Sequence, residues 1–152
     1  MTKNLTAMIL AAGLGKRMGA MSNKTPKALI PIAGKPLILW HLEKLALAGF
    51  HRVVINLFHL GSKIEKTIEN LAPKSMEICF SREKTLLETA GGIAKALPLV
   101  KESTFAVING DIYTYYDFME LKHRIMDIDR NANISGHLVL VKNPVHNIEG
   151  DF

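Results

Sequence analysis

Residues 5–19 read LTAMILAAGLGKRMG, a short apolar run that passes directly into a glycine-rich loop. An apolar run of this length that ends at glycines is typical of a buried strand. From here to residue 141 the sequence alternates between strand-like and helix-like segments, without repeats or low-complexity tracts. Such alternation gives right-handed crossover connections and a mostly parallel sheet with helices on its faces. The sequence therefore predicts a three-layer α/β fold, with residues 1–152 forming a single domain.

The spacing of apolar residues, and the turn residues between them, set the expected elements. Extended segments are expected over residues 5–11, 28–32, 52–57, 76–80, 104–108 and 134–141, and helices over residues 37–48, 60–71, 91–97 and 116–128. Thr89 is expected to cap the third of these helices. Parallel sheets bind ligands at the carboxyl ends of their strands. Candidate site residues should therefore lie within residues 12–17, 56–59, 81–89 and 109–111.

The composition excludes several classes of protein. Hydrophobic residues make up 48% of the chain and charged residues 22%, as in ordinary globular proteins. No run approaches the roughly 20 apolar residues of a membrane helix, and the amino terminus has no signal-peptide pattern, which favours the cytoplasm. Because Cys79 is the single cysteine, an intrachain disulfide is excluded.

Positive charge is concentrated near the amino terminus. The formal net charge is +5, and six basic residues precede the first acidic residue, Glu43. One-sided charge of this kind attracts anions. The basic residues alternate with glycine, proline and alanine rather than with stacking aromatics, so small phosphates are expected as ligands in preference to nucleic acids.

The loop after the first strand has the residues of a phosphate site. Gly13 and Gly15 let backbone N–H groups approach an anion closely, and Lys16 and Arg17 follow at the tip of the loop. A guanidinium can hold a phosphate through two parallel hydrogen bonds. The dinucleotide fingerprint is not met, because its third glycine, Gly19, comes one position late, and the Walker pattern is absent. Taken alone, a glycine-rich turn is more often only a turn.

Two further segments place charged side chains near this loop. Lys27 lies between Pro26 and Pro31, which stiffen the backbone that carries it, although an ordinary surface lysine is the plain alternative. Asp111 follows Asn109-Gly110 directly after the strand expected at residues 104–108. Asn-Gly also favours hairpins, but the next residues follow a helical pattern instead of a paired strand. The carboxylate of Asp111 is therefore expected at the crevice, where it can bind Mg²⁺.

The segment LETAGG, residues 87–92, combines small residues with the start of a helix. Such a backbone offers a close surface for a base or ribose, and Glu88 or the nearby Ser81 can bond its edge. A simple helix cap is the commoner explanation. The six histidines and Cys79 show no zinc-ligand spacing, and no G-x-S-x-G pattern occurs, so neither a zinc site nor a serine hydrolase is expected.

Taken together, these motifs resemble those of the sugar-1-phosphate nucleotidyltransferase family. The match includes the loop at residues 11–18, Pro26 and Lys27 with Pro31, the turn at residues 34–38, and Asn109-Gly110-Asp111. Within the family, the chain is most similar to bacterial N-acetylmuramate α-1-phosphate uridylyltransferases. That closer similarity rests on residues 54–60, 87–89 and 143–152.

The resemblance implies a Rossmann-like sheet of the nucleotidyltransferase type and a Mg²⁺-dependent reaction. A nucleoside monophosphate would pass from a nucleoside triphosphate to a sugar 1-phosphate, with release of pyrophosphate. In the most similar group, the nucleotide is UMP and the acceptor is N-acetylmuramate 1-phosphate. Arg17, Lys27 and Asp111 would be catalytic, and Asp111 would hold the metal. The residues implied for the nucleotide are Ala12, Gly13, Gly15, Lys16, Arg17, Ser81, Glu88 and Gly92, and those for the sugar phosphate are Lys27, Asn109 and Gly150.

Three features depart from the family pattern. Ala20 stands where a proline is usual, Ala90 stands where a glycine is usual, and the second metal-binding aspartate of the family falls beyond residue 152. The chain is therefore expected to be truncated at its carboxyl-terminal side. A sheet cut short after residue 141 would expose an edge that favours a homo-oligomer.

Other functions share part of this pattern. A mannose-1-phosphate guanylyltransferase or a glucose-1-phosphate thymidylyltransferase would carry the same motifs, because the choice of base and sugar depends on pocket shape. A non-catalytic nucleotide-binding module is the alternative from another class. A nicotinamide-dependent oxidoreductase comes third.

Overall fold

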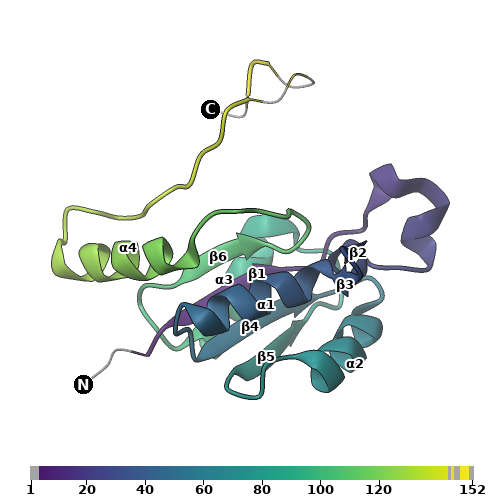
Figure 1. Cartoon of the computed structure of the whole chain (residues 1–152), viewed down its shortest axis with the longest axis horizontal. Coiled ribbons are helices and arrows are strands. Elements are labelled where there is room, and N and C mark those ends of the chain that lie inside the picture. Colours follow the sequence, from purple (N-terminus) through teal and green to yellow (C-terminus); the bar gives the residue numbers. More distant parts are fainter. Residues whose placement is uncertain (1–3, 144, 146–147, 151–152) are drawn as a thin grey trace.

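Four parallel strands form the central sheet, in the order β5-β4-β1-β6 (Figure 1). They are β1 (Thr6–Leu10), β4 (Arg52–Leu57), β5 (Glu77–Arg82) and β6 (Ala106–Asn109). The helices are α1 (Leu37–Leu47), α2 (Gly61–Leu71), α3 (Glu88–Val100) and α4 (Phe118–Arg130). The computed structural model describes residues 4–143, 145 and 148–150, without the side chains of residues 16 and 17.

The long connection between β1 and α1 contains only short elements. One 3-10 helix covers Lys16–Asn23 and another covers Lys27–Leu29. The two-residue strands β2 (Pro31–Ile32) and β3 (Lys35–Pro36) then pair in antiparallel fashion. Trp40 Nε1 of α1 donates to the carbonyl oxygen of Ile32 at 3.0 Å, so the small hairpin is fixed to α1.

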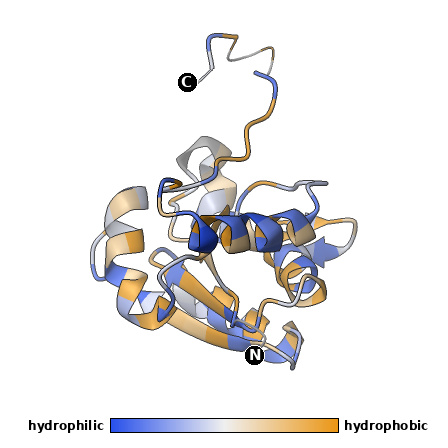
Figure 2. Ribbon diagram, turned by 90° about the vertical axis from the view of Figure 1, so that its left-hand side faces the viewer, coloured by the Kyte–Doolittle hydropathy of each residue, from blue (hydrophilic) through white to orange (hydrophobic). Residues whose placement is uncertain are grey.

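Three expected elements differ from the structure. The extended segment expected over residues 28–32 is wrong in its first half, because Lys27–Leu29 forms a 3-10 helix and only Pro31–Ile32 is a strand. α3 begins at Glu88 after an N-cap, Leu87, whose side chain makes no cap bond, so the expectation that Thr89 caps this helix is wrong. The expected strand at residues 134–141 is also wrong, because these residues pair with no strand in the described part of the chain. A strand needs a neighbour for its N–H and C=O groups. The segment instead runs away from α4 with its hydrophobic residues in the open (Figure 2), and Leu138 is 68% exposed.

The other helices agree closely with expectation in their existence and order. Asp117 is the N-cap of α4, and its Oδ1 accepts from the backbone N–H of Met119 at 2.9 Å, which explains where this helix begins. None of the described helices is both long enough and apolar enough to cross a membrane.

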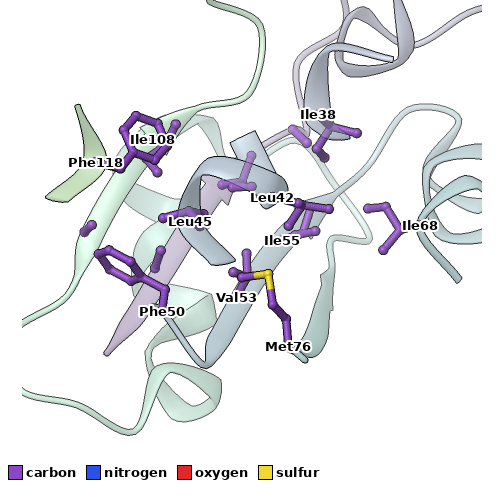
Figure 3. Close-up of a cluster of buried hydrophobic side chains, with 14 of the residues drawn as sticks. Ile38, Leu42, Leu45, Phe50, Val53, Ile55, Ile68, Met76, Ile108 and Phe118 are labelled. Atoms are coloured by element: carbon purple, nitrogen blue, oxygen red, sulfur yellow. The ribbon is translucent and has the colours of Figure 1, made fainter. Parts of the chain in front are cut away.

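Alternate residues of the strands pack on opposite faces of the sheet. Ala7 and Ile9 of β1 belong to the larger core, together with residues of α1, α2 and α4. Figure 3 shows how side chains from these helices gather over the strands. Met8 points the other way and packs with Ala96 and Val100 of α3. The prediction of a parallel, three-layer α/β sheet is therefore confirmed.

The end of α1 shows how local sequence fixes the turn into the sheet. Gly49 has a φ of 84°, in the left-handed region that favours glycine. Its N–H donates to the carbonyl oxygen of Ala46, and the N–H of Phe50 donates to that of Leu45, both at 3.0 Å. This is the Schellman pattern of helix ends. Phe50 is buried in the same core as Leu45, so the turn delivers the chain to β4.

Candidate active site

A cleft opens at the carboxyl ends of β1, β4 and β6, the edge where a parallel sheet binds its ligands. The residues that line it are Leu10 to Gly13, Lys27, Ala28, Asn56, Leu86, Glu88, Thr89 and Asn109 to Asp111. Its volume is about 180 Å³. Small-molecule sites usually enclose roughly 300–1,000 Å³, so the cleft formed by the described residues is smaller than a typical small-molecule site.

Lys27 and Asp111 meet in this cleft as an ion pair. Lys27 Nζ lies 2.8 Å from Asp111 Oδ2, with the two side chains 25% and 40% exposed. Partly exposed pairs of this kind contribute roughly 0–1 kcal/mol to stability. A substrate phosphate or a metal ion could therefore separate the two groups at little cost.

Gly110 explains why Asp111 stands so near the loop that follows β1. The N–H of Gly110 donates to the carbonyl oxygen of Leu10 at 2.9 Å, which continues the pairing of β1 with β6. A Cβ at this position would lie only 2.7 Å from that same oxygen. The close approach therefore requires glycine. No hairpin follows Asn109-Gly110, because the chain continues to α4, as the sequence predicts.

The backbone of Lys27 is held by short-range bonds. Pro26 is extended, and a single 3-10 turn follows, in which the N–H of Ile30 donates to the carbonyl oxygen of Lys27 at 3.0 Å. The stem of Lys27 passes close to Gly15, whose φ is 66° and where an added Cβ would lie 3.4 Å from Lys27 Cγ. Gly15 thus gives the lysine room to reach the cleft.

The structure describes only some of the side chains in the predicted phosphate loop. Ala12 and Gly13 line the cleft, and Gly15 lies beside Lys27. The side chains of Lys16 and Arg17 lie outside the described part of the structure, so their predicted contact with phosphate stays a prediction.

The segment after the loop is anchored by residues near the start of α2. His59 Nε2 lies 3.0 Å from the carbonyl oxygen of Ser22. Lys63 Nζ donates to the carbonyl oxygen of Lys24 at 2.6 Å. These bonds fix the path of the chain between the loop and Lys27.

The predicted nucleoside segment reaches the cleft through Glu88 and Thr89 at the start of α3. The φ of Glu88 is 56°, an uncommon backbone conformation for a residue other than glycine. Ser81 is buried in β5 and Gly92 in α3, and neither lines the cleft. Gly150 belongs to the segment beyond α4 and does not line it either. The roles proposed for these residues stay predictions.

Sequence reasoning did not single out Asn56 and Glu83. Asn56, at the end of β4, lines the cleft and is 3% exposed, and Glu83, just after β5, is 8% exposed. The signal was present, since an asparagine near the end of the apolar run at residues 52–57 and an acid just after β5 are unusual in buried places.

A buried histidine lies behind the Asp111 loop. His41 of α1 is 1% exposed, and neither ring nitrogen makes a hydrogen bond of ordinary geometry within the described residues. Burial lowers the pKa of His41, and Lys44 lowers it further, whereas the nearby Ile112 backbone and Asp111 raise it. The net effect is a neutral imidazole at pH 7.

Asp111 could supply one carboxylate ligand of a magnesium site at the cleft. Among the described residues, no three His, Cys, Asp or Glu side chains cluster as a metal site. Mg²⁺, however, is commonly held by only one or two carboxylates together with substrate phosphates and waters. Asp111 has the chemistry and the partial exposure for that role.

Comparisons with known proteins identify the family of this chain. The nucleotidyl transferase family model matches residues 6–147. The chain is 47% identical, over 97% of its length, to the N-acetylmuramate α-1-phosphate uridylyltransferase of Neisseria meningitidis serogroup B, and spans 64% of that protein. It is 33% identical, over 90% of its length, to the mannose-1-phosphate guanylyltransferase catalytic subunit beta of Drosophila pseudoobscura pseudoobscura, and spans 36% of it.

A solved structure supports the same assignment. HddC from Yersinia pseudotuberculosis, complexed with GMP-PN, superimposes with a TM-score of 0.71 at 31% sequence identity, over 81% of this chain and 55% of that one. The chain thus spans less than two thirds of each of these relatives. Sequence and fold together show that this chain belongs to the nucleotidyl transferase family.

Proposed function

We propose that this chain is the nucleotide-binding part of a sugar-1-phosphate nucleotidyltransferase. The reaction would transfer UMP from UTP to N-acetylmuramate α-1-phosphate and release pyrophosphate. The observation that carries the proposal is the Lys27–Asp111 pair, which sets a cation and a carboxylate side by side at the carboxyl edge of the sheet. The identity of 47% with a uridylyltransferase supports the choice of substrates.

The proposed reaction requires the protein mainly to align the two substrates and to neutralise their charge. The attacking phosphate oxygen of a sugar 1-phosphate is already ionised at neutral pH, so no general base is needed. Catalysis then depends on holding the two substrates in line and on neutralising the charge that they bring together. A cleft with a glycine-rich loop, a stiffly held lysine and the carboxylate of Asp111 suits that task.

The predicted phosphate-binding and sugar-binding residues have distinct roles in this scheme. Arg17 and Lys16, with the amides of the loop, would hold the departing pyrophosphate. Lys27 would neutralise the α-phosphate and the incoming sugar phosphate. Asn109 lines the cleft and would contact sugar hydroxyls, a role also proposed for Gly150.

The predicted cofactor is Mg²⁺, held by Asp111. When bound, the ion would offset negative charge on the phosphate oxygens. Asp111 would turn one oxygen towards it and would release Lys27 to the substrate.

A guanylyltransferase acting on mannose 1-phosphate is the second candidate, favoured by the Drosophila relative and by the GMP-PN complex of HddC. Relative rates of pyrophosphate release with UTP, GTP and dTTP, each against N-acetylmuramate 1-phosphate, mannose 1-phosphate and glucose 1-phosphate, distinguish the candidates. We expect the highest rate with UTP and N-acetylmuramate 1-phosphate. A preference for GTP and mannose 1-phosphate would replace the proposal with the second candidate, and nucleotide binding without any pyrophosphate release would indicate a non-catalytic module.

A further inference from the structure

Two polar side chains are buried beneath one wall of the cleft. Asn56 is the residue of β4 in register with Leu10 of β1. It follows Val54 at a spacing of two residues and so faces the α3 side of the sheet, where Val54 packs. Glu83 comes directly after β5. Burying an amide and a carboxyl group is unfavourable unless both are hydrogen-bonded.

Hydrogen bonds link these side chains into a chain that joins two loops. The backbone N–H of Ala11 donates to Asn56 Oδ1 at 2.8 Å. Asn56 Nδ2 donates to Glu83 Oε1 at 2.9 Å. Glu83 Oε2 accepts from the backbone N–H of Leu87 at 3.0 Å. The first loop is the predicted phosphate loop, and the second leads into the predicted nucleoside segment.

The order of donors and acceptors in this series of hydrogen bonds follows from the groups at its two ends. Both ends are backbone N–H groups, so each must meet an acceptor. The amide oxygen of Asn56 and one carboxylate oxygen of Glu83 accept from these two N–H groups. The inner bond joins the two side chains, with the Asn56 amide as donor and the other Glu83 oxygen as acceptor. Each oxygen of Glu83 thus accepts a hydrogen bond from the protein, and the pair is bonded to both backbones.

Gly92 leaves the space that this arrangement needs. A Cβ at Gly92 would lie 2.7 Å from Asn56 Nδ2 and 2.9 Å from Glu83 Oε1. Glycine inside a helix is unfavourable, so its place in α3 requires a reason, and the buried pair supplies one. Gly92 also lies one turn after Glu88, so its contact with the pair sets how closely the cleft-lining start of α3 approaches β4.

We propose that Asn56 and Glu83 are positioning residues that hold the phosphate loop and the nucleoside segment at a fixed separation. This inference rests on the proposed nucleotide binding. If the two loops contact opposite ends of one nucleoside triphosphate, fixing their separation in advance removes the need to order them on binding. The same fixed geometry aligns the α-phosphate for attack.

The test is an exchange of the amide and the carboxylate. Asn56→Asp places two carboxylates against each other, and Glu83→Gln leaves one side-chain amide donor facing another donor. In the double variant Asn56→Asp/Glu83→Gln, the carboxylate at position 56 would still accept from Ala11, and the amide oxygen at position 83 would accept from Leu87. The inner bond would form with its direction reversed. We expect each single variant to weaken UTP binding by roughly 10-fold or more, and the double variant to recover most of that loss.

Two further measurements separate positioning from simple destabilisation. Amide exchange at Ala11 and Leu87 should quicken at least about 10-fold in the single variants and return in the double variant, in samples shown to be folded by circular dichroism. Glu65→Gln is the matched control, because Glu65 Oε1 pairs with Arg82 Nε at 2.6 Å away from the cleft. It should leave both readouts unchanged.

The outcomes distinguish this inference from the function on which it rests. Unchanged amide exchange in both single variants would overturn the inference, whether or not the protein binds UTP. Loss of UTP binding that the double variant does not recover, despite restored amide exchange, would also overturn it. If the unvaried protein binds no nucleoside triphosphate while amide exchange responds as expected, the proposed function fails and the positioning role fails with it.

Discussion

At the scale of single residues, Lys27 is the positively charged side chain best placed to act on a reacting phosphate, among the residues that the structure describes. Its backbone is held by Pro26 and by a 3-10 turn, and its ammonium group already lies beside a carboxylate in the cleft. A group that is aimed before the substrate arrives stabilises charge in the transition state without further ordering. Its contribution should therefore appear in the chemical step.

We expect Lys27→Ala to lower kcat by roughly 10²-fold or more in the complete enzyme. Lys24→Ala is the matched control, because Lys24 is a nearby lysine that does not line the cleft, and it should leave kcat unchanged. Steady-state kinetics with a saturating sugar phosphate provide the measurement. A raised KM at constant kcat would show that Lys27 only binds the substrate.

Asp111→Asn should weaken the response to Mg²⁺ while the fold is kept. The carboxylate is 40% exposed and pairs only with Lys27 among the bonds described, so its removal leaves no buried group unsatisfied. We expect the Mg²⁺ concentration for half-maximal activity to rise roughly 10-fold or more, because one hard oxygen ligand loses its charge. A normal Mg²⁺ titration would show that another residue holds the metal.

Sequence reasoning identified the exposed members of the cleft more readily than the buried ones. Lys27 and Asp111 could be proposed because prolines flank the first and a strand precedes the second. Their contact with each other, across 84 residues, depends on β6 lying next to β1, which no local pattern reveals. The bonds of Asn56 and Glu83 were missed for the same reason.

At the scale of secondary structure elements, His41 connects α1 to α4 and to the Asp111 loop. Its ring stacks on Phe118 of α4, with the ring centres 6.2 Å apart and the planes within 4° of parallel. The other groups that act on it are Lys44 of α1 and, from the loop, Asp111 and the backbone of Ile112. Burial is the largest effect, and it lowers the pKa of the imidazole.

This lowered pKa predicts a loss of stability in mild acid. The unfolded chain takes up a proton at a pKa of about 6.5, whereas folded His41 resists protonation. The free energy of unfolding should therefore fall as the pH drops below about 6.5, down to the lowered pKa, and should be unaffected by His41 at higher pH. Urea unfolding between about pH 5 and pH 8 measures this slope. His41→Phe should reduce it, whereas His123→Gln, at a side chain 58% exposed, should not. Equal slopes in all three proteins would contradict the assignment.

Strands and helices could be predicted where burial follows a clear period. β4 was predicted with its observed bounds because both faces of a parallel strand are covered, which makes four of its six residues apolar. Residues 134–141 have the same apolar character, but strand formation also needs a partner. In the described chain β6 is the last strand of the sheet, and a groove of about 560 Å³ separates it from residues 135–139. Local sequence cannot show whether that partner is present.

At the scale of the whole molecule, the fold positions a site that the described residues only partly enclose. The cleft has a volume of about 180 Å³ and two acidic residues on its walls, Glu88 and Asp111. The outer edge of β6 and the hydrophobic residues beyond α4 are open as well (Figures 1 and 2). The chain spans 64% of the Neisseria meningitidis relative. The described residues thus supply more of the groups needed to bind a nucleotide than of the groups needed to catalyse the transfer.

We therefore predict that residues 1–152 bind a nucleoside triphosphate but catalyse the transfer poorly. Mg²⁺ is held by one or two carboxylates along with phosphates, and Asp111 is the single carboxylate beside Lys27 among the described residues. The comparison is uridylyltransfer by this chain and by the full-length Neisseria meningitidis relative, under identical Mg²⁺ and substrate conditions. We expect UTP binding within about 10-fold of the relative and a kcat lower by roughly 10²-fold or more. Equal turnover would contradict the prediction, and the second ligand would then be sought among Asp117, Glu149 and Asp151, the last of which lies outside the described residues.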